Sequence, residues 1–518
     1  MNEIDRAEWR WAAIRAAILV VAASLPYLIA WAAAPGDLVY TGFLSNPEDG
    51  QTYLAKMRQG WEGAWRFTLP YTPEPHRGEF LITAYLALGR LARWTGLPLI
   101  VVFHLARAVA GFLLLLAVYD AAACFFSDRA QRRFAFTLTA LGSGFGWLAL
   151  LAGRMTVDIW VPEGFVFYSL FVNPHFPLSI ALMWLALRWS VTPWGGRRIE
   201  GRRLAGVAAA AAGLGLLQPF CLLTVGAVLL VYTLILWAQK RRLPWREVVS
   251  GLVFAAAGLP FVLNAYLATL RNPAFAAWSA QNQTLSPPPL DYVLGYGLVL
   301  ILALPGIAAA LRRRRDSDWL LVAWVGCTAA LLYLPFSLQR RLVMGLILPL
   351  GALAARGWAR LTRQRRPRTG LLWATVSLTN VVLIVVALFG VWTGHEALFV
   401  RQDERAAMDW LAEHAPPDAL VIAAPSTGLL IPTYGGQRVF YGHPFETAHA
   451  ELRARQLEAF YARGDRALLQ EPVALEADYV FYGPRERALC DGAWAPDPAW
   501  RAVYENDTVA LYQIAPGE

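Results

Sequence analysis

A series of long apolar runs, recurring from residue 11 to residue 393, most constrains how this 518-residue chain can fold. Many of these runs approach the ~20 residues that a straight helix needs to cross a bilayer. Hydrophobic residues make up 57% of the sequence and charged residues only 16%, whereas soluble globular proteins carry about 25% charged residues. The composition therefore excludes a soluble enzyme, a disordered chain and a fibrous protein. It predicts a polytopic α-helical membrane protein.

The apolar runs predict about eleven transmembrane helices. The first run is too long for the core of a signal peptide, so we expect it to remain as an uncleaved span. Several other runs are shorter than a full span, and short or broken helices of this kind usually line a cavity inside a bundle. The runs lie near residues 11–34, 98–126, 134–152, 176–190, 204–217, 219–238, 248–267, 291–311, 319–335, 342–356 and 371–393.

Charge divides the chain into two parts. Residues 1–394 contain 36 Lys and Arg against 18 Asp and Glu, whereas residues 395–518 contain 10 against 19. We therefore predict a transmembrane domain over 1–394, with a large first external loop at 35–97, and a soluble α/β domain over 395–518. Stretches typical of three buried strands, one helix and a hairpin turning at Asn506-Asp507 lie at 419–425, 438–442, 478–483, 446–463 and 501–514.

The basic clusters between the apolar runs predict the orientation, because cytoplasmic loops carry an excess of Lys and Arg. They place the N-terminus inside and the acidic C-terminal domain outside. Residues 80–96 resemble a span, but the run is short and carries Arg90 and Arg93, so we predict an interfacial or re-entrant helix on the outer face. The clusters are Arg6 and Arg10; Arg129, Arg132 and Arg133; Arg197, Arg198, Arg202 and Arg203; Lys240, Arg241 and Arg242; Arg312 to Arg315; and Arg360 to Arg368.

The first external loop holds the most informative polar residues. Its segment NPEDGQTYLAKMRQGWEG (46–63) places Glu48 and Asp49 just before a short amphipathic helix that carries Tyr53. An acidic side chain in such a loop can serve as a general base. The alternative is that Glu48 or Asp49 simply caps a helix starting near Gly50. Lys56 and Arg58 then form the solvated face of that helix.

A second segment of this loop, YTPEPHRGEF (71–80), adds Glu74, His76 and Arg77 on the same side of the membrane. Together with the first segment it forms a pattern: an acidic residue soon after the first span, a Tyr four positions later, and a Pro-rich stretch of mixed charge. In this pattern, and in the topology of residues 10–394, the chain resembles the GT-C superfamily of integral membrane glycosyltransferases. The common motif there is Asp-Glu or Asp-Asp, whereas this chain has Glu48-Asp49-Gly50.

The groups that this chain resembles are the protein O-mannosyltransferases, the lipid A aminoarabinose transferases and the RgtA/B/C/D-like bacterial lipopolysaccharide sugar transferases. The resemblance implies a sugar donor on polyprenyl phosphate, a lipid or cell-envelope glycan acceptor, and inversion at the anomeric carbon. It implies that Asp49, whose spacing to Tyr53 fits the family, is the base, with Glu48 as its neighbour and Glu74 as the second acid. Otherwise Glu74 is an ordinary loop acid.

The leaving phosphate needs positive charge on the outer side, where basic residues are scarce. Arg340 and Arg341 lie in a short outer loop and are candidates to bind the phosphate; the alternative is that they contact lipid head groups. His76 and Arg77 stand where related transferases have a basic phosphate ligand.

Two further residues of the apolar part are candidates for the site. Arg107 lies within an apolar run, where an arginine is usually paired or functional, so an ion pair with a first-loop acid is the alternative. His175 stands between Pro174 and Pro177 at an outer helix start. It is a candidate to position phosphate or acceptor, or else an interfacial histidine.

Outside the membrane part, the stretch FYGHPFET (440–447) brings together His443, Glu446 and Thr447 after a predicted strand. Ligands often bind at such a position in α/β domains, but helix initiation, with Glu446 in the first turn, is the favoured interpretation. The four Cys exclude a disulfide framework.

No cofactor is required by the sequence, and nucleic acid is not an expected partner. The seven His are scattered without metal-ligand spacing, although a divalent ion held by Glu48, Asp49 and Glu74 stays open. A flippase for a lipid-linked saccharide and a catalytically silent scaffold are the alternatives to a transferase. The strong preference for Arg over Lys indicates a GC-rich bacterium, so membrane lipids of its inner membrane are expected to surround the chain.

Overall fold

The computed structural model describes residues 4–196, 198–362, 369–464, 466–470, 474, 476–490 and 494–514. Arg197 and positions 363–368 of the predicted basic clusters lie outside the described residues. The chain forms two compact units. We call them the helical unit, with Met1–Pro26, His104–Leu263 and Thr284–Phe389, and the α/β unit, with Tyr27–Phe103, Asn264–Gln283 and Gly390–Glu518.

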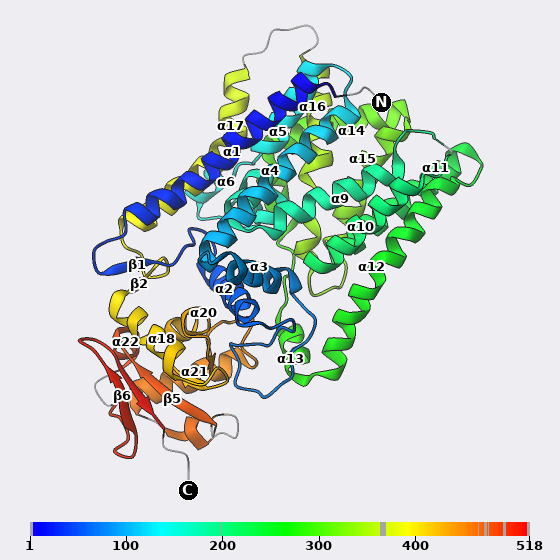
Figure 1. Ribbon diagram of the computed structural model, residues 1–518. Coiled ribbons are helices and arrows are strands. Elements are labelled where there is room, and N and C mark those ends of the chain that lie inside the picture. The colour runs from blue at the N-terminus through cyan, green and yellow to red at the C-terminus, as the bar shows by residue number, and fades with distance from the viewer. Residues whose placement is uncertain are drawn as a thin grey trace. The chain divides into compact units, whose positions relative to one another are not determined.

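Each of the eleven predicted apolar runs contains a helix (Figure 1). Among the described residues, seven helical segments are long and apolar enough to cross a membrane. Six of them are single helices: α1 (Arg6–Ala32), α4 (Leu99–Phe125), α11 (Cys221–Lys240), α12 (Trp245–Arg271), α14 (Pro289–Arg313) and α17 (Thr369–Trp392). The seventh, Arg129–Ala152, consists of α5 (Arg129–Leu141), α6 (Gly146–Ala149) and η1 (Leu150–Ala152). The chain is therefore a multi-pass membrane protein, as predicted.

The other four predicted spans are shorter helices of 15 to 17 residues. Because these four fall short of a straight span, the count of eleven transmembrane helices stays a prediction. Within the helical unit, α9 packs on α10 and α16 packs on α14 and α5. The four are α9 (His175–Val191), α10 (Gly201–Leu217), α15 (Asp316–Leu331) and α16 (Ile347–Leu361).

Short helices and one buried carboxylate organise the segment between α5 and α9. Asp158 accepts hydrogen bonds from the backbone N–H groups of Gly144 and Gly146, both at 3.0 Å, and from Thr156 Oγ1 at 2.6 Å. These bonds satisfy backbone groups that the break after α5 would otherwise leave unpaired in an apolar surrounding. The short elements are α7 (Val157–Trp160), η2 (Pro162–Gly164), α8 (Val166–Val172) and, farther along the chain, η3 (Gln339–Val343).

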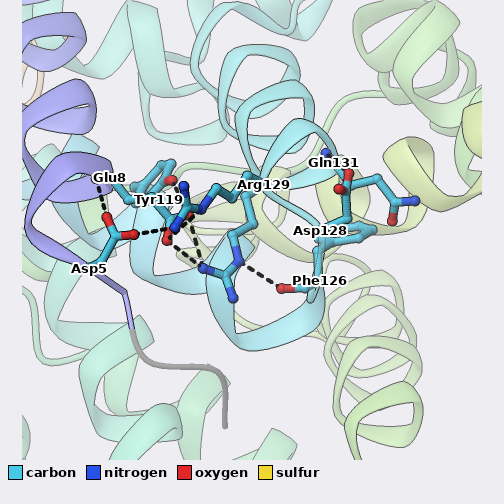
Figure 2. Close-up of polar contacts among 8 residues, drawn as sticks. Asp5, Glu8, Tyr119, Phe126, Asp128, Arg129 and Gln131 are labelled. Carbon is cyan, nitrogen blue, oxygen red and sulfur yellow. Dashed lines mark hydrogen bonds and ion pairs between the residues drawn. The ribbon is translucent and has the colours of Figure 1, made fainter.

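The start of α1 is fixed by a buried ion pair, drawn in the close-up of Figure 2. Glu8 accepts from Arg132 Nη1 at 2.9 Å and from the Tyr119 hydroxyl at 2.9 Å. Glu8 and Arg132 are both only 2% exposed. Arg129 pairs with Asp5, which lies at the surface. Thus Arg129 and Arg132, two members of one predicted cytoplasmic cluster, tie α1 to the connection between α4 and α5.

The α/β unit contains a five-stranded sheet in the order β4 (Arg438–Val439), β3 (Leu420–Ile422), β5 (Ala477–Tyr482), β7 (Ala510–Gln513) and β6 (Arg501–Glu505). The strands β4, β3 and β5 are parallel, while β6 and β7 form an antiparallel hairpin. Asn506 Oδ1 accepts from Val509 N at 2.8 Å and closes the hairpin turn. The predicted strands, hairpin and α/β class are therefore confirmed.

Several helices of the α/β unit surround this sheet (Figure 1). The predicted helix at 446–463 is observed as α21 and begins four residues later than expected. The helices of the C-terminal segment are α18 (Gln402–His414), α19 (Pro425–Gly428), α20 (Ile431–Tyr434), α21 (Ala450–Arg463), η4 (Arg466–Gln470) and α22 (Pro484–Leu489). The unit also contains α2 (Pro47–Glu62), α3 (Thr83–Thr95) and α13 (Pro273–Gln281), which come from preceding segments.

The first loop and the C-terminal segment share one core within this unit. Ala55 and Tyr71 of the loop are buried in the same apolar cluster as Met408 and Val421. In addition, β1 (Leu38–Tyr40) pairs antiparallel with β2 (Phe399–Arg401). Because both contacts join segments more than 300 residues apart, the loop is an integral part of the α/β unit.

The segment 80–96 forms α3, whose 13 residues extend only about 20 Å. That length is too short for a span, in agreement with the prediction of a non-spanning helix. It packs closely on α2, since a Cβ at Gly89 would lie 1.8 Å from the Met57 carbonyl oxygen and a Cβ at Gly60 would lie 2.0 Å from that of Leu86. Its location at the membrane interface stays a prediction.

We expect Glu8→Ala to destabilise the helical unit by about 2 to 3 kcal/mol, because it leaves the buried Arg132 guanidinium without its carboxylate. Thermal unfolding of the full-length protein in detergent would measure this effect. Asp5→Ala, which removes a more exposed acid that caps the start of α1 at Glu8 N, is the matched control and should cost only about 1 kcal/mol. Equal midpoints for both variants would contradict the structural role of Glu8.

Candidate functional site

The acidic pair of the first loop lies in the first turn of α2. This helix begins at Pro47, and its N-cap residue is Asn46, in the left-handed conformation with φ of 48°. The prediction that Glu48 or Asp49 caps a helix starting near Gly50 is therefore wrong. Both acids instead stand where the helix dipole favours negative charge. Glu48 is exposed, and 49% of the Asp49 side chain is exposed, so a small hydroxyl compound can reach both.

His443 of the C-terminal segment lies against Asp49. Its Nε2 atom is 3.6 Å from Asp49 Oδ1, while its ring is buried. The other ring nitrogen, Nδ1, accepts a hydrogen bond from Phe445 N at 3.2 Å. The α/β unit thus places an imidazole from the segment after β4 beside the acid predicted to be the base.

The same segment places Glu446 beside Lys56. Lys56 Nζ donates to Glu446 Oε1 and, at 3.0 Å, to Thr52 Oγ1, and it lies 5.1 Å from the centre of the Tyr53 ring. Lys56 is 2% exposed, so the prediction of a solvated face is wrong for it. The second oxygen of Glu446 is buried and has no hydrogen-bond partner among the residues that the structure describes.

Helix initiation by Glu446 is also wrong, because α21 starts only at Ala450, with His449 as its N-cap at φ 55°. Residues 443–447 form a turn instead. Thr447 Oγ1 accepts from the backbone N–H groups of Gly442 and His443, both at 3.2 Å. This turn presents His443 and Glu446 to α2.

Arg58 also links α2 to the C-terminal segment. It pairs with Glu62 at 2.7 Å and donates to the backbone oxygens of Tyr434 at 2.8 Å and Gly435 at 3.1 Å. These bonds tie the middle of α2 to the end of α20. The predicted solvated face of α2 is therefore covered by protein at Arg58 as well.

The second loop segment is held by its own polar contacts. Glu74 accepts from Thr72 Oγ1 and pairs with Arg453 of α21 at 3.1 Å. His76 accepts from Leu69 N at its Nε2 atom, at 2.8 Å, and its Nδ1 atom lies 2.7 Å from the Glu74 carbonyl oxygen. Burial lowers the pKa of His76, so its ring is neutral at neutral pH with both nitrogens engaged. Arg77 is exposed.

Tyrosines surround the acidic turn of α2. Tyr53 stacks on Tyr85, with 4.6 Å between the ring centres. Burial and then the charge of Glu446 raise the pKa of Tyr71 well above its usual value. Burial and then the charge of Glu48 raise the pKa of Tyr441. These hydroxyls therefore stay protonated at neutral pH.

The predicted phosphate ligands Arg340 and Arg341 lie in η3 of the helical unit. The Arg340 guanidinium lies 4.6 Å from the centre of the Trp160 ring, and that of Arg341 lies 6.0 Å from the Phe220 ring. The Arg340 Nε atom is buried and has no hydrogen-bond partner within the described part of the chain. Glu163 of η2 is buried, and η2 contacts η3.

The other two predicted residues of the helical unit are buried as well. Arg107 donates to the Leu170 carbonyl oxygen at 2.6 Å, to Ser24 Oγ at 3.2 Å and to His104 Nδ1 at 3.2 Å. His175 is the first residue of α9, as predicted for a helix start, and contacts the Phe176 ring. Arg107 therefore bridges α4 to the end of α8.

Sequence reasoning missed two contacts of this site, Asp49 with His443 and Lys56 with Glu446. The polar stretch 440–447 was the one signal available in the sequence. It indicates a cluster of polar residues, but nothing in the sequence shows that this cluster contacts α2. No group of three or more His, Cys, Asp or Glu side chains suited to a metal ion occurs among the described residues. The divalent ion between Glu48, Asp49 and Glu74 thus gains no support from their arrangement.

The comparisons with known proteins place the chain in one fold. No protein-family model matches the sequence, and no curated protein matches it. The chain is similar in structure to ArnT from Cupriavidus metallidurans bound to undecaprenyl phosphate, with a TM-score of 0.54, 15% identity and coverage of 96% of this chain and 97% of ArnT.

Two more solved structures are similar to the chain. The Archaeoglobus fulgidus oligosaccharyltransferase tethered to an acceptor peptide gives a TM-score of 0.52 at 14% identity, covering 93% of this chain and 69% of that one. The mycobacterial arabinofuranosyltransferase AftD gives 0.53 at 17% identity, covering 99% of this chain but 42% of AftD. The chain therefore has the GT-C fold that the sequence resemblance predicted, and identities this low establish the fold alone.

We expect Lys56→Leu to destabilise the α/β unit by about 3 kcal/mol, because Glu446 is then buried without its counter-charge. The double variant Lys56→Leu with Glu446→Leu should recover most of that loss, since two apolar side chains can replace a buried ion pair. Thermal unfolding in detergent measures both. Asp409→Ala, which breaks the exposed pair with Arg405, is the control and should have little effect. A double variant no more stable than Lys56→Leu would contradict the pairing.

Proposed function

We propose that this protein is an inverting membrane glycosyltransferase. It transfers a sugar from a polyprenyl-phosphate donor to a lipid or cell-envelope glycan acceptor at the outer face of a bacterial inner membrane. The observation that carries the proposal is the GT-C fold, shared over 96% of the chain with a protein crystallised with undecaprenyl phosphate. The proposal requires the orientation that the basic clusters predict, with a cytoplasmic N-terminus and an extracytoplasmic C-terminal part.

Asp49 is the base in this proposal. Its carboxylate takes the proton from the acceptor hydroxyl while the hydroxyl oxygen forms a bond to the anomeric carbon of the sugar. The bond from that carbon to the phosphate oxygen breaks, and its electron pair leaves with the polyprenyl phosphate. The position of Asp49 supports this role, because it is half-exposed and its place in the first turn of α2 favours the ionised form.

The leaving phosphate needs cations but little acid assistance, since polyprenyl phosphate, a phosphate monoester, is already a good leaving group. Arg340 and Arg341 are the proposed ligands. The buried Arg340 Nε atom without a hydrogen-bond partner among the described residues supports this role, because such a donor is costly unless a ligand satisfies it. Arginine also binds phosphate through two donors in a fixed geometry. The Trp160 ring restricts the guanidinium by stacking.

The function can be tested by reconstituting the full-length protein in liposomes. Synthetic undecaprenyl phosphates carrying different labelled hexoses and pentoses serve as donors, and an envelope extract from a deletion strain serves as acceptor. Transfer of label with release of undecaprenyl phosphate supports the proposal. Movement of intact labelled donor across the liposome membrane without transfer would instead support a flippase. Absence of both activities with every donor would contradict the proposal.

We expect Asp49→Asn to lower the turnover number by about 100-fold or more, because the acceptor proton then has no base. Protein yield and the unfolding midpoint should stay unchanged, since the carboxylate is half-exposed. Asp37→Asn, in the same loop with 72% of its side chain exposed, is the matched control and should retain full activity. Full activity of Asp49→Asn would show that Asp49 is not the base.

Arg340→Gln should raise the KM for the donor by about 10- to 100-fold, which corresponds to loss of a hydrogen bond to a charged group. Arg340→Lys should raise it less, because the charge remains. Arg271→Gln removes an exposed arginine at the end of α12 and is the control. An unchanged donor KM in Arg340→Gln would remove Arg340 from the phosphate site.

A further inference from the structure

We propose that His443 is a positioning residue that orients the Asp49 carboxylate for proton abstraction. The C-terminal part of the chain thereby completes the catalytic site formed by the first loop. This inference rests on the proposed role of Asp49 as the base. It also gives a functional reason for the turn at 443–447, because the proposed transfer reaction uses no residue of this turn.

The hydrogen bond from Phe445 identifies the atom of His443 that faces Asp49 as a donor. Phe445 N donates to Nδ1, so Nδ1 carries a lone pair and no proton. In the neutral ring the proton then resides on Nε2, which is the atom 3.6 Å from Asp49 Oδ1. This distance exceeds the 2.7 to 3.2 Å that is usual for a hydrogen bond. Hydrogen bonds of catalytic groups are often long without substrate and shorten in the substrate complex.

The imidazole of His443 is fixed by its surroundings, so it can restrict the orientation of a neighbouring side chain. His443 is 2% exposed, its ring lies near those of Tyr71 and Phe445, and its backbone N–H donates to Thr447 Oγ1. The side chain of Gln281 in α13 donates to the carbonyl oxygens of Pro444 at 2.6 Å and Thr447 at 2.7 Å. The Lys56–Glu446 ion pair fixes the other end of the turn on α2.

Asp49 needs a fixed neighbour to orient its carboxylate, because it is half-exposed in the first turn of a helix. An exposed carboxylate samples several rotamers, and a catalytic group must hold its geometry closely to be effective. A donor at Oδ1 restricts rotation about the side chain, so the carboxylate keeps one orientation toward the acceptor hydroxyl. An Nε2–H group that donates to the carboxylate in the substrate complex also favours the ionised form of Asp49.

Two substitutions separate positioning from packing. His443→Gln keeps an N–H donor at about the place of Nε2, whereas His443→Phe fills the space without a donor. We expect His443→Phe to lower kcat about 10- to 100-fold with an unchanged donor KM, and His443→Gln to retain most of kcat. The assay uses whichever synthetic donor the wild-type protein turns over. A wild-type kcat in His443→Phe, or equal losses in both variants, would overturn the inference.

A second measurement does not depend on transfer activity. Magic-angle-spinning NMR of the full-length protein in lipid, with ¹⁵N-labelled histidine, reports the tautomer of each of the seven His, and His443→Gln identifies the His443 signals. We expect the Nε2–H tautomer and a shift of the Nε2 signal in Asp49→Asn but not in Asp37→Asn. Tyr71, whose ring lies near that of His443, and Glu446 of the same turn are unchanged in both variants.

The Nδ1–H tautomer, or an Nε2 signal that does not respond to Asp49→Asn, would overturn the inference even if sugar transfer is observed. Conversely, the expected NMR result together with full transfer activity of Asp49→Asn would contradict the proposed base and leave the His443–Asp49 contact intact. The failure of the inference and the failure of the proposed function are thus distinguishable.

Discussion

The buried contact between Lys56 and Glu446 fixes how the C-terminal segment meets α2, and the geometry of the candidate site follows from it. Both side chains are almost fully withdrawn from solvent, and two charges can be buried together only when each compensates the other. The pair joins residues 390 positions apart in sequence. It therefore fixes the turn after β4 on α2, and the shared core around Ala55 and Tyr71 follows from the same contact.

Once this turn is fixed, the surroundings of the acidic residues on α2 follow. The first turn of the helix supplies the carboxylates of Glu48 and Asp49, and the C-terminal segment supplies His443 beside one of them. The glycines at the crossing of α2 and α3 allow close backbone contact, so α2 is held on two sides. An acid on a helix supported in this way can be exposed to substrate and still keep a defined position, which a flexible loop does not provide.

The sequence was sufficient to predict that the helices and strands exist, because their existence depends on local pattern. The apolar runs predicted the helices, and the short apolar stretches near residues 420, 438 and 478 predicted the strands, because periodicity and length are local properties. It was insufficient for Lys56, which looks like a surface lysine on an amphipathic helix. Only the C-terminal segment, distant in sequence, covers that face. The helix start at Pro47 was missed although Asn46 followed by Pro47 and two acids is a local start signal, because Pro is favoured at the first helical position and Asn before it.

Four arginines of the helical unit differ in how their charge is compensated by described residues. Arg132, Arg188 and Arg356 are each paired with a carboxylate, on Glu8, Asp120 and Asp318. In these three pairs the charge is compensated within the fold, so the arginines fix helices to one another. Arg340 differs, because its buried Nε atom has no hydrogen-bond partner among the described residues and its described guanidinium neighbour is the Trp160 ring. A ring face attracts a cation but accepts no conventional N–H bond from its edge, so this donor is consistent with the phosphate proposed as its ligand.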